Sequence, residues 1–171
     1  MYTYTNVTGQ GTYFREDQEF RQPWLWILLV ALTAFAAGIV SVSLAQQPAD
    51  SRGTWTVALM GVGVPVAAAV LLYVLKLSVS IDDRYLHVRY FPLLRRDIPL
   101  EDIVHFEVRT YRPIREYGGW GIRYSFGRGM AFNVSGNRGV QLELKNGKRV
   151  LIGSQRPEEL AAALARVKQG R

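Results

Sequence analysis

Residues 109–128 hold the most distinctive chemistry of the chain, because five arginines there are interleaved with aromatic side chains. Guanidinium groups bind phosphates and carboxylates and also stack on aromatic rings. Such a surface suits anionic lipid headgroups, nucleic acid or an acidic peptide. Among these three partners we favour the lipid surface, since a tethered domain meets headgroups at high effective concentration, and we do not expect nucleic acid. The candidate lipid- or partner-binding residues are Arg109, Arg112, Arg115, Trp120, Arg123, Tyr124 and Arg128.

A structural interpretation of the same stretch stays open. Its glycines and Pro113 suit a long loop with turns, with Trp120 packed beneath it and no binding role. Arg95 and Arg96 would add to the same basic face if the first interpretation holds.

The sequence offers no recognisable catalytic or metal-binding group of residues. There is no cysteine, and both histidines, His87 and His105, lie within alternating apolar patterns. Pairs of acids such as Asp82–Asp83 stand at turns or helix starts, and neighbouring strand residues point to opposite faces. No nucleophile-elbow, dinucleotide-binding or phosphate-loop pattern occurs. We therefore expect no enzymatic activity, no metal and no cofactor.

The chain contains two uncharged apolar stretches, 24–44 and 55–75, which would hold the candidate binding residues near a membrane. Each would form a helix of about 31 Å, the thickness of the hydrocarbon core of a bilayer. We expect a two-helix transmembrane hairpin with spans at about 24–45 and 55–76, packed through small residues such as Gly38 and Gly63 and kinked at Pro65. A cleaved signal peptide at 1–45 is the less favoured alternative, because the apolar run is too long.

The charge distribution predicts the orientation of these spans. Residues 76–171 carry 18 Lys and Arg against 10 Asp and Glu, whereas the link 45–54 is neutral overall. Because basic residues are retained in the cytoplasm, both termini should be cytoplasmic in a multi-pass protein of the inner or plasma membrane. The expected parts are an N-terminal cytoplasmic arm (1–22) without regular structure except for a short extended piece at 2–8, the hairpin (23–77) and a cytoplasmic domain (78–171).

From residue 77 onward the apolar period changes to two, which indicates β-strands. About seven short strands are expected up to residue 152, with a single helical turn at 99–102 and a loop at 111–121. Asn146-Gly147 between alternating apolar residues is the strongest hairpin signal. A final helix should begin at Pro157 and bury Leu160, Ala163, Leu164 and Val167.

This order of elements resembles small prokaryotic membrane proteins that carry a pleckstrin-homology-like (PH-like) domain behind a two-helix anchor. The resemblance is closest in residues 118–123, 139–144 and 152–160. It implies an α+β membrane protein in which an antiparallel barrel or sandwich is capped by the C-terminal helix. One departure is that the first hairpin tip carries Asp82-Asp83, whereas phosphoinositide-binding relatives cluster basic residues there.

Together these patterns predict a non-enzymatic integral membrane protein. Its PH-like cytoplasmic domain would serve protein interaction or contact with an anionic lipid surface. The alternative is an accessory subunit of a membrane transporter or membrane enzyme complex. No pattern in the chain identifies a ligand, an oligomeric state or a physiological process.

Overall fold

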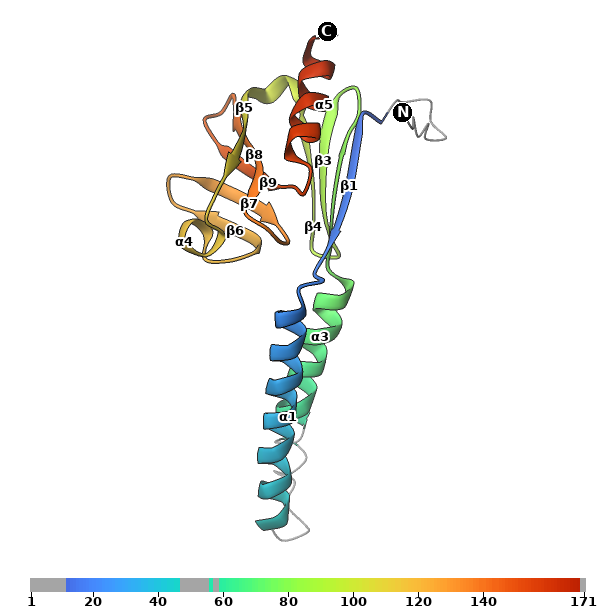
Figure 1. Cartoon of the computed structure of the whole chain (residues 1–171), viewed down its shortest axis with the longest axis vertical. Coiled ribbons are helices and arrows are strands. Elements are labelled where there is room, and N and C mark those ends of the chain that lie inside the picture. The colour runs from blue at the N-terminus through green and yellow to red at the C-terminus, as the bar shows by residue number, and fades with distance from the viewer. Residues whose placement is uncertain (1–11, 47–55, 57–58, 170–171) are drawn as a thin grey trace. The chain divides into compact units, whose positions relative to one another are not determined.

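The computed structural model describes residues 12–46, 56 and 59–169 of the 171-residue chain. It divides into two compact units, one made of Met1–Glu19 with Leu75–Arg171 and the other of Phe20–Val74 (Figure 1). The structure is α+β, with two sheets and a C-terminal helix. The expected extended piece at 2–8 and residues 47–54 of the link lie outside the described residues.

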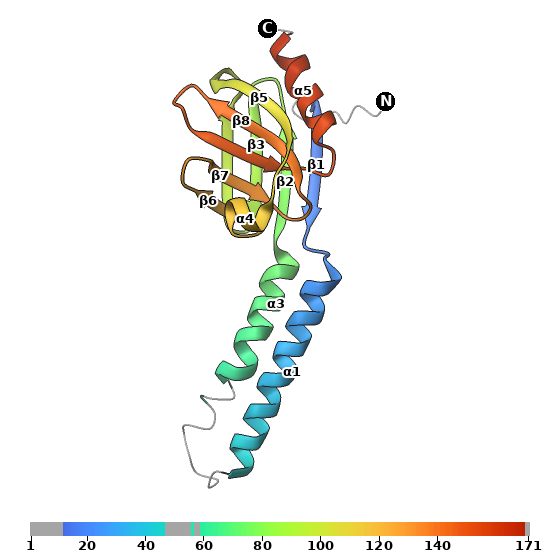
Figure 2. The ribbon, with the colours of Figure 1, turned by 60° about the vertical axis from the view of Figure 1, so that its left-hand side comes forward.

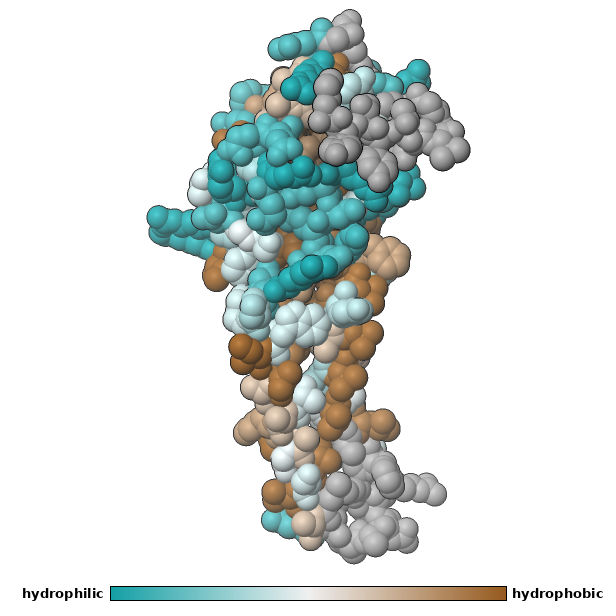
Figure 3. All heavy atoms as spheres, turned by 45° about the vertical axis from the view of Figure 1, so that its right-hand side comes forward, coloured by the Kyte–Doolittle hydropathy of each residue, from teal (hydrophilic) through white to brown (hydrophobic). Residues whose placement is uncertain are grey.

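The unit Phe20–Val74 is helical and apolar. Helix α1 (Pro23–Gln46) confirms the helix expected at 24–44, and its part Pro23–Ser43 is the one helix in the described residues long and apolar enough to cross a membrane. The second apolar stretch contains a π-helical turn, η1 (Leu59–Gly63), followed by α3 (Val64–Val74). In Figure 3 the hydrophobic side chains on the visible face gather on this unit, and the other unit is largely hydrophilic.

The close approach between α1 and the second stretch differs from the expected one. A Cβ built on Gly61 would lie 2.8 Å from Cγ2 of the buried Val40, whereas Gly38 and Gly63 have no atom within 4 Å of such a Cβ. The small-residue stripe predicted through Gly38 and Gly63 is therefore wrong as the contact between these two segments. The approach to α1 occurs instead at Gly61, within the π-helical turn that ends at Gly63.

The first sheet of the larger unit has the order β1-β2-β3-β4 and is antiparallel throughout (Figure 2). Strand β1 precedes the apolar helices in sequence and pairs with the strand that follows them, Glu19 lying opposite Lys76. The prediction of an N-terminal arm without regular structure is therefore wrong for residues 14–19. The four strands are β1 (Phe14–Glu19), β2 (Lys76–Ile81), β3 (Tyr85–Phe91) and β4 (Leu94–Pro99).

The second sheet has the order β5-β8-β9-β7-β6, and here β7 and β9 run parallel. The expected single turn and the Asn146-Gly147 hairpin are confirmed as η2 (Leu100–Asp102) and the β8–β9 connection. A short helix, α4, replaces part of the expected loop. The further elements are β5 (Ile103–Thr110), α4 (Pro113–Tyr117), β6 (Gly121–Ser125), β7 (Gly129–Asn133), β8 (Arg138–Leu144) and β9 (Arg149–Gly153).

The two sheets enclose the core, and helix α5 (Pro157–Gln169) packs against β5, β8 and β1. The predicted stripe of Leu160, Ala163, Leu164 and Val167 is buried, as expected. Nine strands in two separate sheets do not form a closed barrel within the described residues, so the barrel form of the prediction is wrong. The coarser prediction of strands followed by a terminal helix is confirmed.

Candidate anion-binding surface

Residues 109–128 form the end of β5, helix α4, strand β6 and the turn before β7. Pro113 suits the first turn of helix α4, because the backbone N–H that proline lacks would have no hydrogen-bond partner within the helix there. It ends at Gly118, whose φ of 75° places it in the left-handed region that glycine favours. This one-turn helix sets the positions of the arginines around it.

Glu116, on α4, forms ion pairs with two of the predicted arginines. Its carboxylate forms ion pairs with Arg109 and Arg128 and accepts the backbone N–H of Arg112 at 2.8 Å. Burial alone raises the pKa of Glu116, but the amide of Arg112 and the two guanidinium groups outweigh it and hold that pKa below its usual value. Arg109 and Arg128 are therefore tied to an internal carboxylate, which reduces their attraction for an external anion.

Trp120 and Arg123 mainly hold the loop together. The indole N–H of Trp120 donates to the Gly136 carbonyl at 2.9 Å, and Nε of Arg123 donates to the Trp120 carbonyl at 3.0 Å. Tyr124 is exposed, and its ring lies edge-on to that of Phe126, with centroids 6.0 Å apart. Arg112 and Arg115 are exposed on and beside α4. The structure thus divides the predicted surface into internally bonded and outward-facing residues.

A basic pocket of about 610 Å³ lies beside this surface. Its cations are Arg96 from β4 and Lys148 and Arg149 from the β8–β9 hairpin, and Tyr124 also lines it. The rest of the lining consists of Met130, Val150 and three glycines, Gly127, Gly129 and Gly147. The parallel pairing of β7 with β9 brings the two turns together, Met130 lying opposite Val150.

The charges in this pocket are only partly compensated. Nε of Arg149 lies 2.9 Å from a carboxylate oxygen of Glu143, whereas Nη1 of Arg96 contacts Sδ of Met130 at 3.4 Å. Within residues 12–46, 56 and 59–169, neither Arg96 nor Lys148 forms an ion pair. Two free cations beside glycine backbone and an aromatic ring favour an anionic, phosphate-bearing ligand.

Sequence reasoning found Tyr124 and Arg96 but missed Lys148 and Arg149. Both follow the Asn146-Gly147 turn directly, so their place at a hairpin tip was readable from the sequence. Their position beside Tyr124 could not be predicted from the sequence. It depends on the parallel pairing of β7 with β9, two strands that are separated in the sequence by β8.

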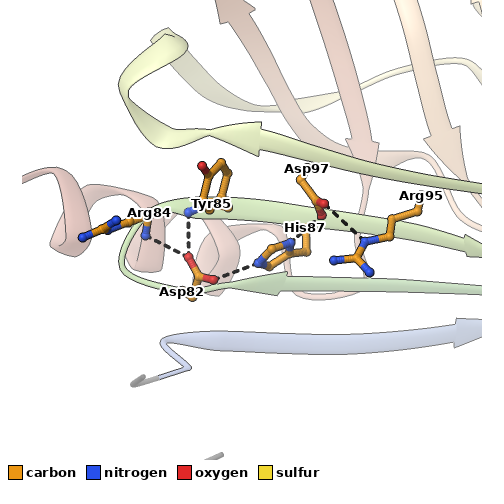
Figure 4. Close-up of polar contacts among 6 residues, drawn as sticks. All are labelled: Asp82, Arg84, Tyr85, His87, Arg95 and Asp97. Carbon is orange, nitrogen blue, oxygen red and sulfur yellow. Dashed lines mark hydrogen bonds and ion pairs between the residues drawn. The ribbon is translucent and has the colours of Figure 1, made fainter. Parts of the chain in front are cut away.

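His87 lies between two carboxylates at the polar end of the first sheet (Figure 4). Its Nδ1 is 2.5 Å from Asp97 and its Nε2 is 2.8 Å from Asp82, which also accepts the amides of Arg84 and Tyr85. Because both ring nitrogens face acceptors, the doubly protonated imidazolium fits this cluster best. The cluster fixes the β2–β3 turn to β4, and neither nitrogen is free to act as a base.

The His87 cluster predicts a pH-dependent stability. Burial lowers the pKa of His87, but the bonds and charges of Asp97 and Asp82 outweigh it and raise that pKa above 6.5. Hydrogen bonding to His87 lowers the pKa of Asp97, and the bonds to Asp82 outweigh its burial and lower its pKa as well. The contribution of the cluster should be complete between about pH 4 and 6.5. It should be lost as the pH rises through the raised pKa of His87, and also as it falls through the lowered pKa values of the aspartates.

We expect the wild-type domain to lose about 1 kcal/mol of unfolding free energy when the pH rises from 6 to 8.5, a value discounted because the cluster is partly exposed. The variant His87→Gln should not show this loss. Urea unfolding of the detergent-solubilised chain at both pH values measures it. An equal change of the unfolding free energy with pH in both proteins would contradict the assignment of the proton to His87.

No protein-family model matches the chain, and a search of curated proteins finds no significant relative.

Proposed function

We propose that this chain is an integral membrane protein whose two-helix anchor holds an α+β domain at the cytoplasmic face, where the domain contacts anionic lipid headgroups through its basic pocket. One observation carries the anchoring: the strands before and after the apolar helices are direct neighbours in one sheet, Glu19 pairing with Lys76. The two strands that flank the segment Phe20–Val74 therefore belong to the same folded unit.

This pairing constrains any membrane crossing. A sheet with unpaired edges is not tolerated in the hydrocarbon region, so β1 and β2 must lie on one side of the bilayer. If α1 crosses, the chain must cross back before Lys76, and the second apolar stretch is the segment available for that return. Exposed Trp24 near the start of α1 suits the interface between lipid and water. In this proposal the number of crossings is even, as it is in a hairpin.

The lipid contact rests on the pocket. A membrane-anchored domain meets the anionic surface of the cytoplasmic leaflet, where each basic residue contributes about 1 kcal/mol of attraction. Arg96 and Lys148 supply two charges without internal ion pairs among the described residues. The domain would thus bind more strongly to a leaflet that contains more anionic lipid, and it would catalyse no reaction.

The full-length protein in nanodiscs tests this contact. A ligand that binds only the folded state stabilises it, so the domain should unfold about 8–16 °C higher in phosphatidylcholine with phosphatidylglycerol than in phosphatidylcholine alone. The double variant Arg96→Gln/Lys148→Gln should lose most of this difference. Lys145→Gln, in the same β8–β9 turn but outside the pocket lining, should keep it. Equal stability in the two lipid mixtures would refute the proposal.

An accessory role beside another membrane protein is the second candidate. Ala34, Gly38 and Val42 recur every four residues along α1, and a Cβ at Gly38 would meet no atom within 4 Å. Small residues on such a face permit close packing of a further helix. Recovery of a stoichiometric membrane partner in mild detergent would favour this candidate.

A further inference from the structure

The two ends of the first sheet have opposite chemistry. The β2–β3 turn carries Asp82, Asp83 and Arg84, as turns usually do. The β3–β4 turn at the other end is apolar, with Phe91 61% exposed and Leu93 58% exposed. Phe91 and Leu93 thus form a small exposed apolar tip on either side of Pro92, which suits contact with an apolar environment.

The register places this tip at the end of the sheet that joins the helices. Phe91 lies opposite Lys76, which in turn lies opposite Glu19. Lys76 is two residues beyond the end of α3, and directly paired residues in antiparallel strands have Cα atoms about 5 Å apart. If the helices cross the bilayer, the β3–β4 turn thus starts next to the point where the chain leaves it.

The charges next to the tip suit an anionic surface. Arg89 and Arg95 lie directly opposite each other on β3 and β4, and both are exposed. Like charges in such a pair destabilise a sheet. Asp97 contacts Arg95 at 3.2 Å, but Arg89 forms no ion pair with any residue that the structure describes. Phosphate groups just above an inserted apolar tip would relieve this repulsion.

We propose that the β3–β4 turn, with Phe91 and Leu93 at its tip, inserts into the interfacial zone of the bilayer while Arg89 and Arg95 contact lipid phosphates. This inference rests on the proposed membrane anchoring and goes beyond it, because it assigns a second lipid-binding element besides the basic pocket. The turn leads into β4, which carries Arg96 into the pocket. The same strand therefore links the apolar tip to the candidate headgroup site.

Depth measurements on the full-length protein test the insertion. The chain has no cysteine, so a single nitroxide label can be placed at Leu93→Cys, at Arg84→Cys in the opposite turn, or at Leu32→Cys in α1. In vesicles of phosphatidylcholine and phosphatidylglycerol, the label at position 93 should be roughly tenfold less accessible to a water-soluble nickel complex than the label at position 84. It should be more accessible to oxygen, as a label in lipid is.

A second substitution separates insertion from an effect of the label. Phe91→Asp should raise nickel accessibility at position 93 towards that at position 84, whereas Tyr85→Asp, at the other end of β3, should leave it unchanged. Equal nickel accessibility at positions 93 and 84 would overturn the inference while a lipid-buried label at position 32 leaves the anchoring intact. A water-accessible label at position 32 would refute the anchoring itself.

Discussion

Gly129→Ala should prevent stable folding of the larger unit. Gly129 has a φ of 81°, and a Cβ there would overlap the Arg149 carbonyl oxygen and lie 2.8 Å from its carbonyl carbon. The left-handed conformation costs a residue with a side chain about 1–2 kcal/mol. Separating β7 from β9 to relieve the overlap would break their parallel pairing, so we expect a total loss of about 4 kcal/mol or more.

Gly127→Ala is the matched control, because Gly127 lies two residues earlier, in the β6–β7 turn, with a φ of 76° but has no atom within 4 Å of the position that a Cβ would occupy. Its unfolding free energy should fall by only about 1 kcal/mol, the cost of placing alanine in the left-handed conformation. Urea unfolding of both variants in detergent separates the two effects. Equal losses would show that the approach of Gly129 to Arg149 does not hold the pocket wall in place.

Glu16→Ala should release β1 from the rest of the unit. Glu16 is only 6% exposed, and its carboxylate accepts the Ser154 hydroxyl at 2.5 Å and the Gln155 backbone N–H at 2.7 Å. Removing the carboxylate leaves two donors without a partner, each costing about 1–3 kcal/mol where water cannot replace it. We expect the unfolding free energy to fall by about 3 kcal/mol and trypsin to cleave faster after Arg15.

Asp17→Ala provides the comparison on the same strand. Asp17 points outward, and its carboxylate lies 3.5 Å from Arg15 and 3.9 Å from Lys76. Exposed ion pairs of this kind contribute about 0.5 kcal/mol, so stability and cleavage should hardly change. A similar effect of both substitutions would show that the Glu16 bonds do not anchor β1.

The sequence predicted the strands after residue 76 well because their alternation is regular and most of their turns contain glycine, asparagine or aspartate. Strand β1 was missed for a physical reason. Its inward positions include Glu16 and Gln18, polar residues where a strand pattern requires apolar ones. They are acceptable there because their partners, Gly153, Ser154 and Gln155, lie far along the chain.

The candidate surface was predicted in composition but not in arrangement. The basic stretch included Tyr124, which lines the pocket, but Glu116, within the same stretch, binds Arg109 and Arg128. Spacing in the sequence does not show which of several arginines a carboxylate will neutralise, because that depends on the one-turn helix α4. Lys148 and Arg149 come from another hairpin, and only tertiary pairing brings them to the pocket.

The pairing of Glu19 with Lys76 has a practical consequence. These residues are neighbours across one ladder, so the whole of Phe20–Val74 occupies the position of a connecting loop between two adjacent antiparallel strands. A two-residue Asn-Gly link is the shortest natural connection for such strands. Joining Glu19 to Lys76 in this way would remove the apolar segment without interrupting the sheet. We expect the shortened protein to fold in water with every β-strand retained.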